Sequence, residues 1–301
     1  MAARWSALAL IGQVLLAAAL AATLAGLTSL GRAAIAVWVV AELYGVALVL
    51  AITPLVLGRG MAPGRLSCRR MGYALLAVFS DALAFEMAMG RMACEPCRAA
   101  PELAAPGPLA PHPVLLVHGF ACSGAVWRPL LARLRAAGVG PARAVSLEPL
   151  FAGIEAHAAG LLEELEKLDS TCGGGTITIV THSMGALVAR AALRRARPRL
   201  IGRIITIAAP HHGTALACRF PLPGVRQMRP DSPWLEELNA AQEGRLTVPV
   251  TTLYSLDDNY VSPPCSARLQ GARAFELQGI GHLGLLTSKG VHEHLIAELL
   301  A

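Results

Sequence analysis

Two long apolar runs open the chain, and short apolar runs that alternate with helical periodicity follow them. Residues 6–31 contain no charged side chain, and residues 33–58 contain only Glu42. At ~1.5 Å per residue, a helix of either run reaches about 39 Å, which is enough to cross the ~30 Å hydrocarbon core of a bilayer. The pattern therefore predicts two transmembrane helices within residues 1–58.

A signal peptide is the alternative interpretation of the first run. Arg4, a Leu- and Ala-rich stretch and the small residues of the triplet 19–21 (A-L-A) would satisfy one. Cleavage of such a leader would leave the second apolar run unexplained, so two spans are the preferred interpretation.

A third apolar stretch, residues 71–90, contains Asp81 and Glu86. An aspartate at the centre of a bilayer costs ~2.5 to 3.5 kcal/mol on insertion scales. This stretch is therefore expected to form an amphipathic helix at the membrane interface, within a connecting segment at 59–111.

The proline-rich residues 99–113 predict a stiff, extended linker, which places the start of a separate domain, 112–301, at its end. With two spans, Arg4 and the arginines of 59–70 lie on one side of the membrane and Arg32 on the other. The positive-inside rule then places the domain in the cytoplasm. A third crossing by the stretch that follows would reverse this orientation.

Six short β-rich runs alternate with helical periodicity after the linker. They are residues 114–117, 143–147, 176–181, 203–208, 248–254 and 273–277. Apolar residues at helical spacing between 154 and 168, and again over 184–195, predict helices between the strands. Continuous apolar strands separated by helices predict an α/β domain with a parallel sheet and helices on both faces.

Composition narrows the classes of function. The chain is 54% hydrophobic and 15% charged, with a formal net charge of +6 carried by scattered arginines, which argues against nucleic-acid binding. The 7 cysteines have irregular spacing, which is not typical of a disulfide-stapled domain. The pair Cys94 and Cys97 lacks the second pair that a zinc site would need, so no metal is expected.

A T-H-S-M-G motif at residues 181–185 stands at the end of the third predicted strand, directly before a predicted helix. A serine on a sharp strand-to-helix turn is held with its hydroxyl exposed, which is the geometry of a nucleophile elbow. The usual G-x-S-x-G form has glycine where this chain has Thr181. An ordinary turn with a buried Ser183 is the alternative interpretation of the motif.

Two backbone N–H groups near that serine could form an oxyanion hole. The sequence H-G-F at 118–120 follows the first predicted strand, where an N–H beside a glycine turn can face the elbow. The N–H of Met184 would be its partner, and two such donors stabilise a tetrahedral oxyanion. His118 itself is expected to be structural.

Histidine is the natural base for a serine nucleophile because its pKa is near ~6.5. His282 follows the last predicted strand in the glycine-rich loop 279–284 (G-I-G-H-L-G), which can bring an imidazole over Ser183. His211 and His212 could rim the pocket, but they precede any usable acid. His292 and His294 are expected on the solvated face of a terminal helix.

The acid that orients the imidazole is expected after the fifth predicted strand. Asp257 and Asp258 both lie there, and either gives the chain order Ser, Asp, His that this architecture requires.

The domain resembles bacterial lipases and esterases of the α/β-hydrolase fold. The stretches that carry the resemblance are 113–127 (P-V-L-L-V-H-G-F-A-C-S-G-A-V-W), 180–190 (V-T-H-S-M-G-A-L-V-A-R), 206–217 (T-I-A-A-P-H-H-G-T-A-L-A), 227–235 (Q-M-R-P-D-S-P-W-L), 254–263 and 279–286. On this resemblance Ser183, Asp258 and His282 occupy the triad positions, and Phe120 and Met184 occupy the oxyanion positions. Asp258 is favoured over its neighbour because D-N-Y-V fits the family's D-x-x-V turn.

The resemblance implies an acyl-enzyme mechanism with no metal or organic cofactor. A short cap at 215–243 would cover the site with apolar residues, which implies lipid-like or lipophilic ester substrates; the same residues could be ordinary cap packing. An acyltransferase with the same triad and a catalytically silent membrane adaptor are the alternatives. The apolar runs before the domain are outside the resemblance, and they imply a protein integral to a bacterial inner membrane.

Overall fold

The computed structural model describes the domain at 112–301 in nearly all its residues. The described residues are 112–172, 174–242 and 246–301, together with Tyr73, Ala77, Asp81, Ala84, Met87 and Ala88. The predicted spans within 1–58, the cysteine pair at 94 and 97 and most of the proline-rich linker lie outside them. Among the described residues, no helix is both long enough and apolar enough to cross a membrane. The chain divides into two compact units, Met1–Met61 and Ala62–Ala301, and every described residue belongs to the second.

A parallel sheet of six strands forms the centre of the domain, as the sequence pattern predicts. The strands are β1 (Val114–Val117), β2 (Ala142–Val145), β3 (Ile177–His182), β4 (Ile201–Ile207), β5 (Val250–Ser255) and β6 (Arg273–Leu277). Their order across the sheet is β2-β1-β3-β4-β5-β6, and every neighbouring pair is parallel. The strand ends differ from the predicted ones by no more than one or two residues.

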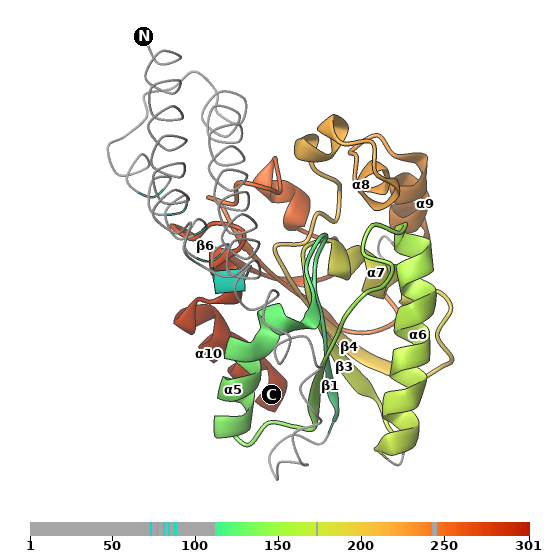
Figure 1. Cartoon of the computed structure of the whole chain (residues 1–301), viewed down its shortest axis with the longest axis vertical. Coiled ribbons are helices and arrows are strands. Elements are labelled where there is room, and N and C mark those ends of the chain that lie inside the picture. Colours follow the sequence, from blue (N-terminus) through green and yellow to red (C-terminus); the bar gives the residue numbers. More distant parts are fainter. Residues whose placement is uncertain are drawn as a thin grey trace, which may run out of the picture. The chain divides into compact units, whose positions relative to one another are not determined.

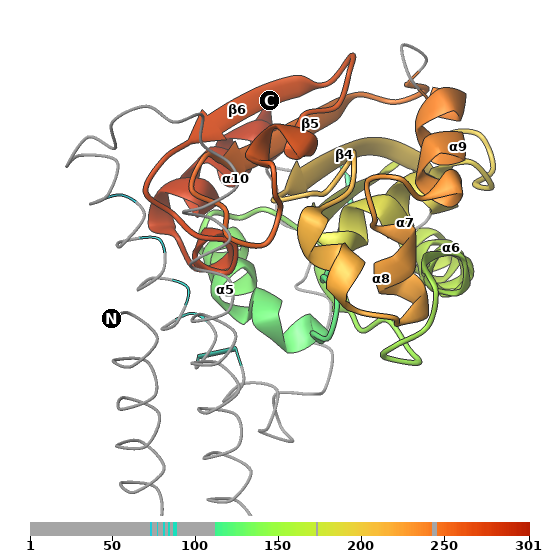
Figure 2. The ribbon, with the colours of Figure 1, turned by 90° about the horizontal axis from the view of Figure 1, so that it is seen from above.

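Helices cover both faces of this sheet. One face carries α5 (Arg128–Ala136) and α10 (Lys289–Leu300), and the other carries α6 (Ile154–Thr171) and α7 (Met184–Leu193) (Figures 1 and 2). Successive side chains along each strand point to opposite faces of the sheet. In β1, for example, Leu115 and Val117 pack with α6 and α7, and Val114 and Leu116 pack with α5 and α10. Burial on both faces explains why the strands are continuously apolar.

The segment 215–243, where a short cap is expected, lies between β4 and β5. Its elements are the 3-10 helix η2 (Ala215–Arg219) and the helices α8 (Pro223–Gln227) and α9 (Pro233–Gln242). Val225, Met228, Leu235 and Leu238 join the apolar cluster on the α6 and α7 side of the sheet. This part of the cap is therefore ordinary packing, whereas Phe220 has 36% of its surface exposed.

The remaining short elements lie in loops. They are the 3-10 helices η1 (Gly124–Trp127), η3 (Pro264–Ala267) and η4 (Gly284–Leu286).

The order of the strands contains a topological switch point between β1 and β3. β1 lies between β2 and β3, so the connections that leave the carboxyl ends of β1 and β3 run to opposite sides. Such a switch point is where open α/β sheets bind ligands. The H-G-F turn at 118–120 and Ser183 follow these two strand ends.

Helix α7 approaches the end of β1 very closely. A Cβ atom at Gly185 would lie 2.5 Å from the carbonyl oxygen of His118 and 2.8 Å from that of Val117. Only a residue without a side chain fits there, because both neighbours are backbone atoms that cannot rotate away.

This close approach gives a test of the fold. We expect Gly185→Ala to lower the free energy of unfolding by ~1 to 3 kcal/mol, because the added methyl overpacks a rigid contact. Gly160→Ala is the matched control, since Gly160 lies in α6 with open space around its missing Cβ. Alanine there should raise the stability by ~0.5 to 1 kcal/mol. Urea denaturation followed by tryptophan fluorescence measures both, and equal stabilities for the two variants would contradict the packing described.

Candidate active site

Ser183 is the single residue between β3 and α7, where the sequence predicts a nucleophile elbow. Its backbone has φ of 54° and ψ of −127°, a conformation that residues with a side chain rarely adopt. The N–H of Ser183 donates to the carbonyl of Ile207 at 2.9 Å, which helps to fix the turn. The residue is only partly buried, so its hydroxyl is not enclosed in the core.

Thr181, which stands where the common motif has glycine, is fully buried within β3. Its hydroxyl donates to the carbonyl of Ile205 at 3.4 Å. The crowding at this elbow therefore lies at Gly185, and the branched residue is accommodated in the sheet.

The turn after β1 lies directly against Ser183. A Cβ at Gly119 would lie 2.8 Å from the Cβ of Ser183, so glycine is needed for the two loops to meet. Within the described part of the chain, the N–H groups of Phe120 and Met184 donate to no other protein group. Met184 opens α7, where an N–H has no acceptor within the helix.

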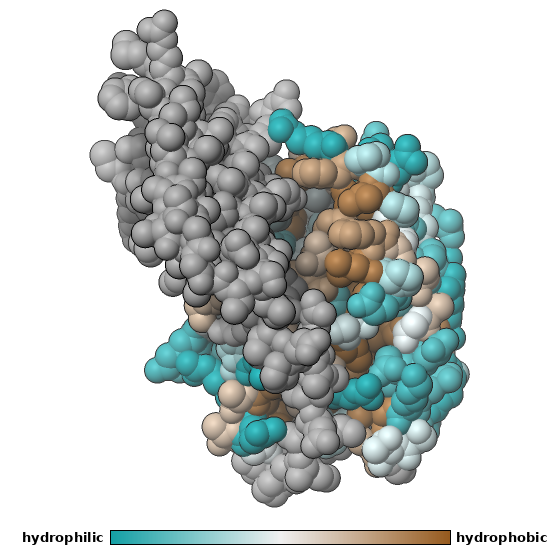
Figure 3. Space-filling model, in the orientation of Figure 1, coloured by the Kyte–Doolittle hydropathy of each residue, from teal (hydrophilic) through white to brown (hydrophobic). Residues whose placement is uncertain are grey.

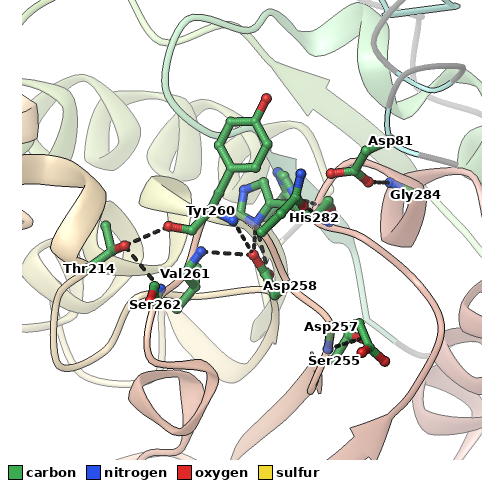
Figure 4. Close-up of polar contacts among 12 residues, drawn as sticks. Asp81, Thr214, Ser255, Asp257, Asp258, Tyr260, Val261, Ser262, His282 and Gly284 are labelled. Carbon is green, nitrogen blue, oxygen red and sulfur yellow. Dashed lines mark hydrogen bonds and ion pairs between the residues drawn. The ribbon is translucent and has the colours of Figure 1, made fainter. Parts of the chain in front are cut away.

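Asp258 and His282 form a buried pair at the ends of β5 and β6 (Figure 4). Nδ1 of His282 lies 2.9 and 3.1 Å from the two carboxylate oxygens of Asp258, and each residue has only 3% of its surface exposed. Oδ1 of Asp258 also accepts the N–H groups of Tyr260 and Val261, each at 2.8 Å. The loop backbone thus holds the carboxylate toward the imidazole.

The surroundings of His282 favour its protonated form. Burial alone would lower the pKa of His282, but the charge and hydrogen bond of Asp258, with a further contribution from the charge of Asp81, raise it above its usual value. Because Nδ1 is held by Asp258, Nε2 is the nitrogen left for proton transfer.

Three more side chains fix the position of His282. The ring of Tyr260 stacks on it at 4.8 Å between centroids, and the ring of His182 lies at 4.6 Å. Nε2 of His182 hydrogen-bonds to the carbonyl of His282 at 3.1 Å, and the side chain of Asn259 accepts the N–H of His282 at 3.1 Å. His182 directly precedes Ser183, so it connects the elbow to the 279–284 loop that carries His282.

No hydrogen bond joins Ser183 to His282 among the described residues. Hydrogen bonds between catalytic groups often form only when substrate is bound.

Asp257, the other acid considered from the sequence, is held elsewhere. Its Oδ2 accepts the N–H of Gly279 at 2.6 Å, and its own N–H donates to the hydroxyl of Ser255. The structure thus brings Asp258, and not Asp257, onto the imidazole of His282.

Two other histidines lie inside the domain. His211, which the sequence allowed at the rim of the pocket, is fully buried between Arg190 and Thr206. His292 was expected on a solvated face, but it is 1% exposed and donates to the carbonyl of Leu286 at 2.8 Å. The packed face of α10 contains residues 291, 292, 295 and 298, so the helical spacing itself puts His292 inside.

His118 has the structural role expected of it. Its Nε2 accepts the N–H of Leu147 at 2.8 Å, which ties the ends of β1 and β2 together. Burial lowers the pKa of His118 to about 4, so the ring is neutral at physiological pH.

Two buried charged residues near the site are not evident from the motifs. Arg190 of α7 donates to the side chains of Gln242 and Asn239 of α9, each at 2.8 Å. Burial lowers the pKa of Arg190 to about 10, so it stays charged at neutral pH. The other is Asp81, which the sequence pattern assigned to an interfacial helix. Its carboxylate is buried and accepts the N–H of Gly284 at 2.8 Å.

Nothing in the described part of the chain resembles a metal centre, since no three His, Cys, Asp or Glu side chains converge there. A cavity of about 340 Å³ lies between β2 and α6, with Arg143, Glu148 and His157 in its lining. It contains none of the residues predicted for catalysis.

Two phenylalanines lie on the side of the turn that follows β1. Phe120 and Phe151 lie 5.7 Å apart between ring centroids, and Phe151 is 50% exposed. Figure 3 shows apolar residues gathered on the visible face, with hydrophilic residues around them.

Comparisons with known proteins bear on the family and the fold. A model of the alpha/beta hydrolase family matches residues 114–290. The chain is similar to the mature lipase BlEst2 of Bacillus licheniformis, with a TM-score of 0.58 and 19% identity over 67% of this chain and 97% of that one. It is also similar to Aspergillus fumigatus lipase B, with a TM-score of 0.57 and 18% identity over 69% of this chain and 58% of that one. No curated protein sequence matches it.

At these identities the solved structures establish a shared fold. The family match covers more than half of the chain and includes all the strand ends that build the elbow and the histidine loop. The chain therefore belongs to the alpha/beta hydrolase family.

Proposed function

We propose that this protein is a membrane-anchored serine hydrolase that cleaves carboxylic esters of lipophilic substrates through an acyl-enzyme. The observation that carries the proposal is the buried Asp258–His282 pair beside the strained Ser183 turn. Serine, acid and base occur in the chain order of this fold, and each follows the carboxyl end of a strand.

In the acylation step, the hydroxyl oxygen of Ser183 attacks the ester carbonyl carbon and its proton passes to Nε2 of His282. The negative charge on the carbonyl oxygen is stabilised by the N–H groups of Phe120 and Met184, which have no other acceptor among the described residues. Collapse of the tetrahedral intermediate breaks the bond to the alcohol oxygen, which leaves with the proton from His282.

Deacylation repeats these steps with water. His282 accepts a proton from the water that attacks the acyl carbon, and the acid departs as Ser183 recovers its proton. Asp258 keeps Nδ1 of His282 protonated and stabilises the imidazolium through both steps. None of these steps requires a metal or organic cofactor.

The preference for lipophilic substrates rests on the apolar surroundings of the elbow. Phe120 and Phe151 lie beside it, and Phe220 of the cap is partly exposed. Apolar groups of a substrate would gain ~25 cal/mol for each Å² of apolar surface that they bury against these side chains. Two membrane spans within residues 1–58 would hold the site near such substrates.

The nucleophile can be tested by substitution. We expect Ser183→Ala to reduce ester hydrolysis by ~10⁴ to 10⁶, because the remaining groups cannot form an acyl-enzyme. The variant should also lose labelling by a fluorophosphonate. Ser170→Ala, at an exposed position near the end of α6, is the control and should keep wild-type activity. A folded Ser183→Ala protein with a tenth of wild-type activity would contradict the mechanism.

The acid can be tested against its neighbour. Asp258→Asn should lower kcat by ~10⁴, because the amide favours the wrong tautomer of His282. Asp257→Asn should change kcat by less than ~10-fold, because Asp257 bonds the loop backbone and not the imidazole. Both values are measured on one soluble ester. A reversed order would move the role of acid to Asp257.

Membrane anchoring can be tested without activity. We expect the full-length protein to stay in the pellet when membranes are extracted with alkaline carbonate, because two spans of ~20 or more apolar residues insert stably. Release into the supernatant would contradict integral insertion.

Sidedness needs a second measurement, a reporter fused after Ala301. We expect an inactive alkaline phosphatase fusion and a fluorescent cytoplasmic reporter, because the arginines at 59–70 resist translocation. An active phosphatase fusion would place the domain outside and contradict this orientation.

A further inference from the structure

Asp81 is a buried carboxylate beside His282 that the mechanism above does not use. Only 3% of its surface is exposed, and Oδ1 accepts the N–H of Gly284 at 2.8 Å. Oδ2 is also buried. Gly284 is two residues after His282, so Asp81 is bonded to the loop that carries the proposed base (Figure 4).

The helical residues around Asp81 lie tightly against this loop. A Cβ at Gly281 would lie 2.6 Å from the carbonyl oxygen of Ala77 and would overlap the carboxyl group of Asp81. A Cβ at Gly279 would lie 3.1 Å from Cδ1 of Tyr73. The loop therefore has glycine at the two points where it meets these residues, which allows Asp81 to reach the backbone beyond His282.

Apolar packing extends the same contact. Ala84 and Ala88 belong to the buried cluster that contains Leu283 of the 279–284 loop and Leu285 of η4. Ala77, Asp81, Ala84 and Ala88 are three or four residues apart and are all buried, so they form one packed helical face. Met87, which is 41% exposed, lies outside that face.

The charges around Asp81 come from the two loops of the proposed site. Burial raises the pKa of Asp81 to about 6; the bond to Gly284, the charge of His282 and the side chain of Asn259 oppose this rise, and the charge of Asp258 adds to it. Asp81 is therefore mostly ionised above neutral pH, where its charge helps to raise the pKa of His282. His182 also faces His282, but burial lowers its pKa well below the usual value, so it is neutral.

We propose that Asp81 is a positioning residue for His282: it holds the 279–284 turn through Gly284 and stabilises the imidazolium as a second carboxylate. This inference rests on the proposed hydrolase function. Asp81 lies outside the family match, which begins at residue 114. The base of the hydrolase domain thus depends on a residue from the segment that precedes the domain.

The test uses full-length protein with Asp81→Ala, Asp81→Asn and the control Met87→Ala. Asp81→Ala removes the acceptor for Gly284, so kcat on a soluble p-nitrophenyl ester should fall ~10- to 100-fold with KM changed less than ~3-fold, because the base is misplaced. Asp81→Asn keeps an acceptor oxygen, and its kcat should stay within ~3-fold of wild type. Met87→Ala should behave as wild type.

The pH profile separates positioning from simple structural support. The base must be neutral to act, so kcat/KM rises with pH through the pKa of His282. Asp81→Asn removes a neighbouring anion, which lowers that pKa and moves the acid limb of kcat/KM to lower pH. Loss of local structure alone would not produce this shift.

The results distinguish the two proposals. If wild-type protein hydrolyses the ester and is labelled by a fluorophosphonate, but Asp81→Asn has an unshifted acid limb, the positioning role is overturned and the hydrolase function stands. If Asp81→Ala keeps the kcat of wild type, the positioning role is likewise overturned and the hydrolase function stands. If wild-type protein neither hydrolyses the ester nor is labelled by the fluorophosphonate, the proposed hydrolase function is overturned, and the positioning role that rests on it is overturned too. Asp81→Asn keeps the test decisive even where Asp81→Ala does not fold.

Discussion

The close approach of helix α7 to the carboxyl end of β1 is the constraint on which the rest of the site depends. It allows no side chain at Gly185, and the loop that follows β1 similarly requires glycine at position 119. With the backbone fixed on both sides, Ser183 is forced to positive φ, and the N–H groups of Phe120 and Met184 are left beside it. The site is thus set by backbone packing at the switch point of the sheet. A threonine at position 181 is accommodated because it lies within the strand and not at the contact.

Features that depend on local spacing could be predicted from the sequence. The continuously apolar runs predicted the parallel sheet. The serine between a predicted strand and a predicted helix indicated the elbow at residue 183. The pairing of Asp258 with His282 followed from chain order and the loop motif, although the neighbouring Asp257 was equally near in sequence. The two spans within 1–58 stay predictions, because the structure does not describe those residues.

Features that depend on distant contacts could not be predicted in this way. Asp81 and Gly284 are 203 residues apart, and a carboxylate within an apolar run is more simply interpreted as a residue at a membrane interface. His292 lies beside Glu293 in a helix, so its polar neighbour suggested solvent although its position in the turn faces the core. Among the residues around His282, the motifs assigned a role only to Asp258. Tyr260, His182 and Asn259 stand within the same motifs, but their stacking on the ring and their bonds to the backbone of His282 are not evident from the sequence.

The buried Arg190 has a consequence for how the cap is attached. Its partners on α9 are the amide groups of Gln242 and Asn239, which carry no charge, and its third neighbour, His211, is kept neutral mainly by burial. The two amide groups do not titrate, whereas free carboxylates and histidines change protonation between roughly pH 4 and 8. The hydrogen bonds from Arg190 of α7 to α9 therefore involve no group that gains or loses a proton in this range. Acidification that protonates exposed carboxylates would leave this connection between the two helices unchanged.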